Sequence, residues 1–199
     1  LLPQIRTEQL SQRVDIFVEQ SAFGLAESRQ FLQKAKALGF DLAVHADQFT
    51  AGSSTLAVEM GALSADHLEA STEKEIHALA QSDTVAVVLP GASLGLGEPF
   101  APARKLLDAG ACVAIASDFN PGSAPMGDLL TQAAILATYQ KLNTAEVLAG
   151  LTFRAAKALK LREIGRVEVG YTADLQGYAC ADFREILYQQ GRLKPYGVW

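Results

Sequence analysis

Ionisable side chains stand where several short apolar runs of this sequence stop. They are Glu19 after VDIFV, His45 after DLAV, His67 at the end of a run from Ala62, and Asp118 after CVAIAS. In a (β/α) barrel, the carboxyl-terminal strand ends converge on one face, where the chemistry is carried out. Imidazole and carboxylate groups, here from His45 and Asp118, suit Zn²⁺ or iron. The pattern therefore indicates a pocket in which strand ends bind a metal.

Each of these residues also has a purely structural interpretation. His45 could be a core histidine satisfied by hydrogen bonds, and His67 could be a neutral imidazole that caps the next helix. After Asp118 the sequence FNPGS offers polar groups to a ligand, but Asn120 could equally cap a Pro-Gly turn. We expect His77, which lies among Glu and Lys residues of a helical stretch, on the surface.

The elements that must position these residues alternate between strand and helix. Apolar runs begin near residues 14, 41, 62, 84 and 111, and spacings of 21 to 27 residues fit successive βα units. Because the runs are apolar almost throughout, they predict a parallel sheet covered on both faces. The expected helices are 25–37, 52–60, 72–81 and 99–108, the third opened by Ser71 and Thr72.

The last third of the chain has a different character. Residues 126–159 are expected to be helical, and glycines at 165, 170 and 177 separate short pieces that suggest a small β element. The run GASLGLG, at 91–97, lacks the Lys-Ser/Thr of a phosphate loop and is not GxGxxG. We interpret it as a mobile loop over the pocket.

Composition narrows the class of protein. The chain has 199 residues, a formal net charge of −5 and 49% hydrophobic residues, which excludes disordered, collagen-like and coiled-coil proteins. Its mild acidity argues against a nucleic-acid or membrane partner, and no apolar run approaches the roughly 18 residues of a membrane span. Cys112 and Cys180 form no disulfide framework, so we expect a reduced, cytoplasmic protein.

Five segments resemble, in order, the second half of the imidazolonepropionase family of the amidohydrolase superfamily. They are VDIFVEQSAF, VHADQF, GALSADHLE, VAVVLPGA and SDFNPGSAP. The resemblance runs from about Val14 to about Ala173 and includes GRVEVGYTADL, similar to the closing pattern of the superfamily. It weakens after Asp174, where Gln176-Gly177-Tyr178 replaces an apolar run.

The resemblance implies hydrolysis of the cyclic amide of 4-imidazolone-5-propanoate to N-formimidoyl-L-glutamate, in histidine degradation. One zinc or iron ion would be bound by His45 and Asp118, and Asp118 would also take a proton from the attacking water. His67 would polarise the substrate carbonyl or hold the water. The remaining matching positions are substrate contacts at Gln48, Asn120, Gly122 and Ser123, and a supportive Glu19.

The sequence also departs from the family pattern in its histidines. The superfamily takes two more metal ligands from a His-x-His pair, and the three histidines here include no such pair. The Arg, Tyr and His residues that bind substrate on the first three strands also have no counterpart. A complete barrel needs roughly 250 residues. We therefore expect the carboxyl-terminal part of a longer enzyme, also because the chain has no initiator Met.

The expected fold is α/β and comprises the last five βα units of a TIM-type (β/α)8 barrel, with extra helices and a small β-sandwich remnant. Residues 1–160 would form the partial barrel and 161–199 the β element. The expected partners are a small-molecule substrate and a second copy of the chain, as a homodimer. Two alternatives remain open: an inactive fragment that is stable only as an oligomer, and another cyclic amidohydrolase of guanine or hydantoin type.

Overall fold

A five-stranded sheet organises the chain. The computed structural model describes residues 1–199, and the strands are β1 (Arg13–Phe17), β2 (Asp41–Ala46), β3 (Ser64–His67), β4 (Val85–Val88) and β5 (Val113–Ile115). They lie in sequence order, and β1 pairs with β2, and β2 with β3, in parallel. The five predicted strands are confirmed. The chain forms two compact units, 1–87 with 105–112 and 88–104 with 113–199, which are described in turn.

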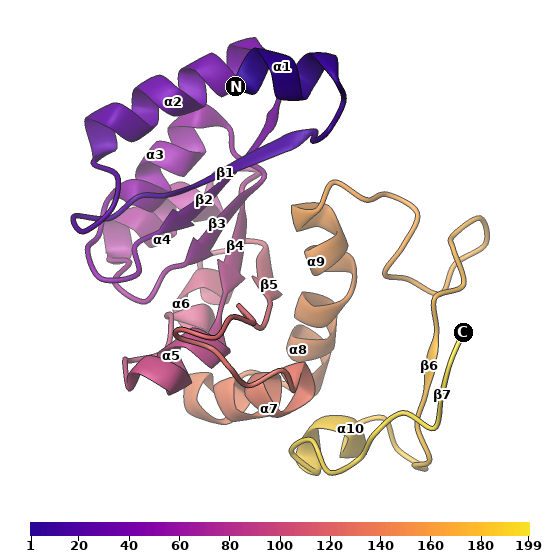
Figure 1. Cartoon of the computed structure of the whole chain (residues 1–199). Coiled ribbons are helices and arrows are strands. Elements are labelled where there is room, and N and C mark those ends of the chain that lie inside the picture. The colour runs from indigo at the N-terminus through magenta and orange to yellow at the C-terminus, as the bar shows by residue number, and fades with distance from the viewer. The chain divides into compact units, whose positions relative to one another are not determined.

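In the first unit, helices cover one face of strands β1 to β3. Figure 1 shows α2 (Leu25–Ala37), α3 (Ser53–Met60) and α4 (Glu73–Ala80) on this face, preceded in the chain by the short α1 (Leu2–Thr7), which the sequence did not predict. Ile16, Val44 and Ala65 are buried. Because side chains alternate along a strand, His45 and Asp66 point to the opposite face from Val44 and Ala65. The helices leave that face to the polar residues.

The ends of these helices follow the capping residues of the sequence. α2 has the bounds that were predicted, and Gly39, with φ of +82°, follows its end. At the start of α4, Glu75 accepts the backbone N–H of Thr72 at 3.1 Å, which closes a capping box. Ser71 has another partner, because its hydroxyl donates to Asp47.

The second unit is mainly helical. It contains α7 (Leu129–Gln140), α8 (Thr144–Leu151), α9 (Phe153–Ala158) and the short α10 (Glu185–Tyr188), in agreement with the expected helical stretch 126–159. α8 and α9 both pack against β5. At the end of the chain, β6 (Gln176–Gly177) and β7 (Gly197–Val198) form an antiparallel pair. The β element is therefore one short ribbon in the structure.

Two local predictions are wrong. Residues 91–97 were interpreted as a loop, but Pro90–Leu96 is a helix, α5, which ends at Gly97 with φ of +71°. Proline suits the first turn of a helix, since its missing N–H has no partner there. The helix predicted at 99–108 begins only at α6 (Ala103–Asp108). Pro99 and Pro102 explain this late start, because proline disfavours helical backbone at the preceding residue.

The glycines of α5 let another backbone segment approach the helix closely. A Cβ at Gly91 would lie 2.5 Å from the carbonyl oxygen of Ser117, and a Cβ at Gly95 would overlap that of Ser123. Gln132, a fully buried residue of α7, donates its amide to the carbonyl of Met126. Residues 117–126 are thus held along their length by α5 and α7.

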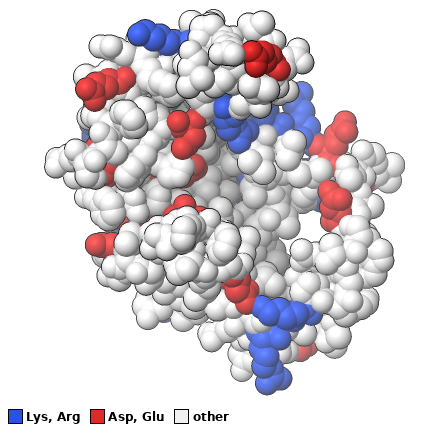
Figure 2. Space-filling view, viewed as in Figure 1, with Lys and Arg blue, Asp and Glu red and all other residues white.

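The charged side chains and the two cysteines complete the description of the surface. Figure 2 shows acidic and basic side chains scattered over the visible face, without a broad area of one sign. Cys112 and Cys180 are free thiols. No helix has the length and apolar character needed to cross a bilayer.

Candidate functional site

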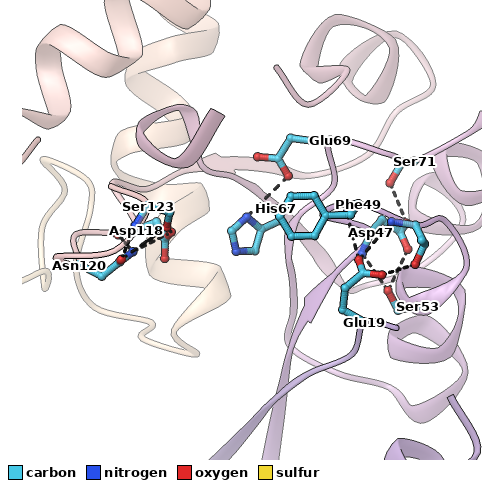
Figure 3. A network of polar contacts seen from close by, with 11 residues as sticks. Glu19, Asp47, Phe49, Ser53, His67, Glu69, Ser71, Asp118, Asn120 and Ser123 are labelled. Atoms are coloured by element: carbon cyan, nitrogen blue, oxygen red, sulfur yellow. Dashed lines mark hydrogen bonds and ion pairs between the residues drawn. The ribbon is translucent and has the colours of Figure 1, made fainter. Parts of the chain in front are cut away.

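Glu19 follows β1 and fastens the loop that follows β2. Its buried carboxylate accepts hydrogen bonds from the backbone N–H groups of Phe49, at 2.9 Å, and Thr50, at 3.1 Å, and from the Thr50 hydroxyl (Figure 3). Burial alone would raise the pKa of Glu19, but these hydrogen bonds favour the ionised form and lower its pKa overall. The role the sequence left as supportive is, in the structure, that of a loop anchor.

Asp47 fastens the same loop from its other end. The residue is fully buried, and its carboxylate accepts the backbone N–H groups of Gly52 at 2.9 Å and Ser54 at 3.0 Å, at the start of α3. It also accepts the hydroxyl of Ser71, at 2.8 Å, from the loop that follows β3 (Figure 3). Asp47 therefore joins the loop after His45 to the loop after His67.

Gln48 lies in the loop that Glu19 and Asp47 hold, between Asp47 and Phe49. Its side chain is half-buried. Asp47 rather than Gln48 satisfies the first amides of α3, which leaves the Gln48 amide free of a capping role.

His45, near the end of β2, stands between carboxylates from both neighbouring strands. Its Nδ1 lies 2.8 Å from Oδ1 of Asp15 on β1. Asp66 on β3 is in register with His45. Burial raises the pKa of Asp66 to about 6. Asp15, His45 and Asp66 each offer a ligand atom within 4.8 Å of the others. The sequence analysis missed Asp15 and Asp66.

His67 ends β3 in a buried and strained position. Its side chain is 4% exposed, and its Nδ1 lies 3.6 Å from Oε2 of Glu69, beyond hydrogen-bond distance. The ring centroids of His45 and His67 are 5.4 Å apart, so both imidazoles belong to one cluster. The backbone φ of His67 is +83°, a conformation that costs about 1–3 kcal/mol and is concentrated at functional sites. The helix that His67 was considered to cap, α4, is capped by Thr72.

In the second unit, Asp118 begins a tightly hydrogen-bonded turn. Its φ is +52°, and Oδ2 accepts the amide of Asn120 at 3.1 Å and the hydroxyl of Ser123 at 3.4 Å (Figure 3). The Asn120 side-chain oxygen accepts the backbone N–H groups of Gly122 and Ser123, each at 2.8 Å. Asn120 therefore caps the Pro-Gly turn and also orients Asp118.

The donor chemistry fits a catalytic metal. Imidazole from His45 and carboxylate from Asp118 are ordinary ligands of zinc and iron, and the hydrogen bonds of Asp118 use Oδ2 alone. The buried Nδ1 of His67 faces the carboxylate of Glu69 at 3.6 Å (Figure 3). His77, by contrast, is exposed on α4, as predicted.

The sequence is similar to imidazolonepropionases of several bacteria. The chain is 44% identical over 200 residues to an imidazolonepropionase of Deinococcus deserti, and 45% identical over 192 residues to one of Deinococcus radiodurans. A Bacillus thuringiensis imidazolonepropionase is 40% identical over 202 residues. These matches cover 96–100% of this chain but 48–50% of the relatives, so the chain spans about half their length.

Solved structures show the same fold at lower identity. A 5-methylcytosine deaminase from Klebsiella pneumoniae superposes with a TM-score of 0.79 at 17% identity, covering all of this chain and 56% of that one. An adenosine deaminase from Xanthomonas campestris with bound zinc gives 0.76 at 23%, covering 100% and 53%. With the parallel order of the sheet, they confirm a partial TIM-type barrel. The family model described as "Amidohydrolase family" matches residues 18–178, and the chain belongs to that family.

Proposed function

We propose that the natural protein carrying this chain is a metal-dependent cyclic amidohydrolase that converts 4-imidazolone-5-propanoate to N-formimidoyl-L-glutamate, a step of histidine degradation. The observation that carries the proposal is 40–45% identity to imidazolonepropionases along almost the whole chain. The resemblance assigns chemistry to His45, His67 and Asp118. They lie near, at or just beyond the carboxyl ends of strands of a barrel sheet, where such enzymes place catalytic residues.

In this proposal, His45 and Asp118 bind one metal ion, zinc or iron. When bound, the metal supplies Lewis-acid activation of water. Two protein ligands are fewer than the three usual at a catalytic zinc site, so the remaining ligands come from outside these 199 residues.

The proton transfers belong to Asp118. Its carboxylate accepts a proton from water as the oxygen attacks the ring carbonyl, and then returns the proton to the nitrogen that leaves when the C–N bond breaks. His67 donates a hydrogen bond to the carbonyl oxygen as negative charge develops there. The hydrogen bonds from Asn120 and Ser123 support this role, because they orient the Asp118 carboxylate.

Substrate recognition is assigned to Gln48 and to the turn of Asn120, Gly122 and Ser123. An amide side chain both donates and accepts, which suits a ring with neighbouring N–H and C=O groups. The hold of Glu19 on Phe49 and of Asp47 on α3 supports this assignment, because both restrict the loop that carries Gln48. We further propose a homodimer, a division at residue 160 and a cytoplasmic location, the last supported by two free thiols.

The test is a comparison of cyclic amides as substrates of the natural protein. Steady-state rates are measured with 4-imidazolone-5-propanoate, a hydantoin and guanine, together with metal content and oligomeric state. We expect the highest kcat/KM for 4-imidazolone-5-propanoate and about one metal per chain. A higher kcat/KM for another cyclic amide would identify that amide as the substrate instead. Absence of both bound metal and hydrolysis would support the alternative of an inactive oligomeric fragment.

A further inference from the structure

A carboxylate stands beside one ring nitrogen of His45, although no part of the mechanism above uses it. Asp15 lies on β1 and His45 on β2, and the register pairs Phe17 with His45, so Asp15 is two residues before the partner of His45. Side chains two residues apart on a strand point to the same face. Asp15 therefore shares the face of His45 that lies opposite the helices.

The contact fixes which nitrogen of His45 carries a proton. Oδ1 of Asp15 lies 2.8 Å from Nδ1 of His45. A carboxylate oxygen accepts hydrogen bonds, so Nδ1 is the donor and holds a hydrogen. In a neutral imidazole the lone pair is then on Nε2, so this tautomer can bind a metal only through Nε2.

We propose that Asp15 is a positioning residue, which holds His45 as the tautomer protonated at Nδ1 and orients its ring so that Nε2 serves as the metal ligand. The proposal rests on the proposed function, in which His45 is a ligand. Histidines that bind metals commonly donate the other ring N–H to a carboxylate, and loss of that acceptor typically weakens metal binding by about 10–100-fold.

The neighbouring Asp66 defines the alternative. Its Oδ1 is buried without a hydrogen-bond partner, and with Asp15 and His45 it forms a group of possible ligands. A cation that binds both carboxylates and Nδ1 of His45, the nitrogen beside Asp15, would remove the hydrogen from Nδ1. The two arrangements therefore require opposite protonation of the same ring, which an experiment can distinguish.

The first measurement is the tautomer of His45 in the metal-free 199-residue chain. Long-range ¹H–¹⁵N spectra at a pH well above the ordinary histidine pKa of about 6.5 report which ring nitrogen is protonated. The chain has only three histidines, and exposed His77 is an internal reference for an unconstrained ring. We expect His45 to be protonated at Nδ1. Protonation at Nε2 in the unsubstituted chain would overturn the proposal without any variant.

Variants then separate positioning from folding. In Asp15→Ala we expect His45 to lose its preference for the Nδ1 proton, whereas Asp15→Asn keeps it, because the amide oxygen still accepts. Glu59→Ala is the control, since it removes the same charge from an exposed ion pair with Arg29. An unchanged His45 tautomer in a folded Asp15→Ala protein would contradict the proposal. If Asp15→Ala does not fold, loss of the Nδ1 proton of His45 in Asp15→Asn would contradict the proposal.

Zinc titration of the same proteins is the second measurement. We expect Asp15→Ala to bind Zn²⁺ about 10–100-fold more weakly than the unsubstituted chain, with Asp15→Asn and Glu59→Ala close to it. Loss of the Nδ1 hydrogen when Zn²⁺ binds would instead show a cation among Asp15, His45 and Asp66, and would overturn the proposal. His45→Ala distinguishes failure of the proposed function from failure of this inference. Unchanged zinc affinity in that variant would contradict His45 as a metal ligand, whereas the tautomer measurement tests the role of Asp15 independently.

Discussion

Replacing Asp47 with alanine would expose how much of the site depends on one buried carboxylate. The substitution removes the acceptor for the N–H groups of Gly52 and Ser54, and for the hydroxyls of Ser53, Ser54 and Ser71. Alanine offers no acceptor in its place, and Asp47 is 0% exposed, so water does not readily replace the lost partner.

The expected loss follows from the groups left behind. Two backbone N–H groups at the start of α3 lose their acceptor, and a buried unsatisfied donor costs about 1–3 kcal/mol. The hydroxyls can turn toward other acceptors, and removal of a buried charge offsets part of the loss. We therefore expect the free energy of unfolding to fall by about 3–4 kcal/mol in Asp47→Ala. Asp47→Asn keeps one acceptor oxygen and should lose about half as much.

Urea denaturation followed by circular dichroism measures both variants. Glu73→Ala is the matched control, because it removes an acidic side chain, 76% exposed, from an ion pair with Lys105, and such pairs contribute about 0–1 kcal/mol. A loss below about 1 kcal/mol in Asp47→Ala would refute the reasoning. Ser71→Ala, which removes only the link to the loop after β3, should cost about 1 kcal/mol.

Four further outcomes are expected. In the natural protein, Asp118→Asn should lower kcat by about 10²–10⁴-fold with little change in KM, measured by steady-state kinetics; near-normal turnover with metal bound would contradict its role. Gln48→Ala should leave metal content unchanged and lower kcat/KM on 4-imidazolone-5-propanoate by about 1–3 kcal/mol in transition-state terms; an unchanged value would transfer weight to another cyclic amide. The 199-residue chain alone should bind Zn²⁺ only weakly, and submicromolar affinity in a chelator competition would disagree. The ion pair with Arg104 lowers the pKa of Glu146, and the Thr72 hydrogen bonds, working against burial, lower that of Glu75. Their stabilisation is therefore complete above the unfolded glutamate pKa of about 4.3 and decreases as pH falls through the folded values; urea denaturation at several pH values should show this decrease, and constant stability down to pH about 3 would argue against it.

The strands and the four ionisable residues near their ends could be predicted, because the sequence changes abruptly there from apolar to ionisable residues. A run such as VAVV is buried at every residue, as expected of a strand that is covered on both faces. The residues predicted in this way are Glu19, His45, His67 and Asp118. Asp15 and Asp66 were missed because they lie inside strands, where a single acidic residue in an apolar run does not mark a strand end. The alternation in VDIFV was the available signal.

The remaining features depend on contacts that the local sequence does not contain. The partners of the Asp47 carboxylate lie from five to 24 residues further along the chain, so no short pattern contains them all. The run GASLGLG is rich in glycine because a backbone segment from beyond β5 lies against it, and not because it forms a loop. A glycine-rich composition does not distinguish a loop from a helix that another backbone segment approaches closely, because glycine is favoured in both.

The glycine face of α5 limits which changes of length the segment 117–126 can accept. Gly91 and Gly95 are one helical turn apart, and the backbone at Ser117 and Ser123 occupies the space of their missing side chains. An insertion between 117 and 126 would have to lift the segment from the helix and lose both contacts. Side-chain exchanges in this turn keep both contacts, so they should be tolerated better than changes of its length. Libraries that vary its length are expected to yield mostly misfolded protein.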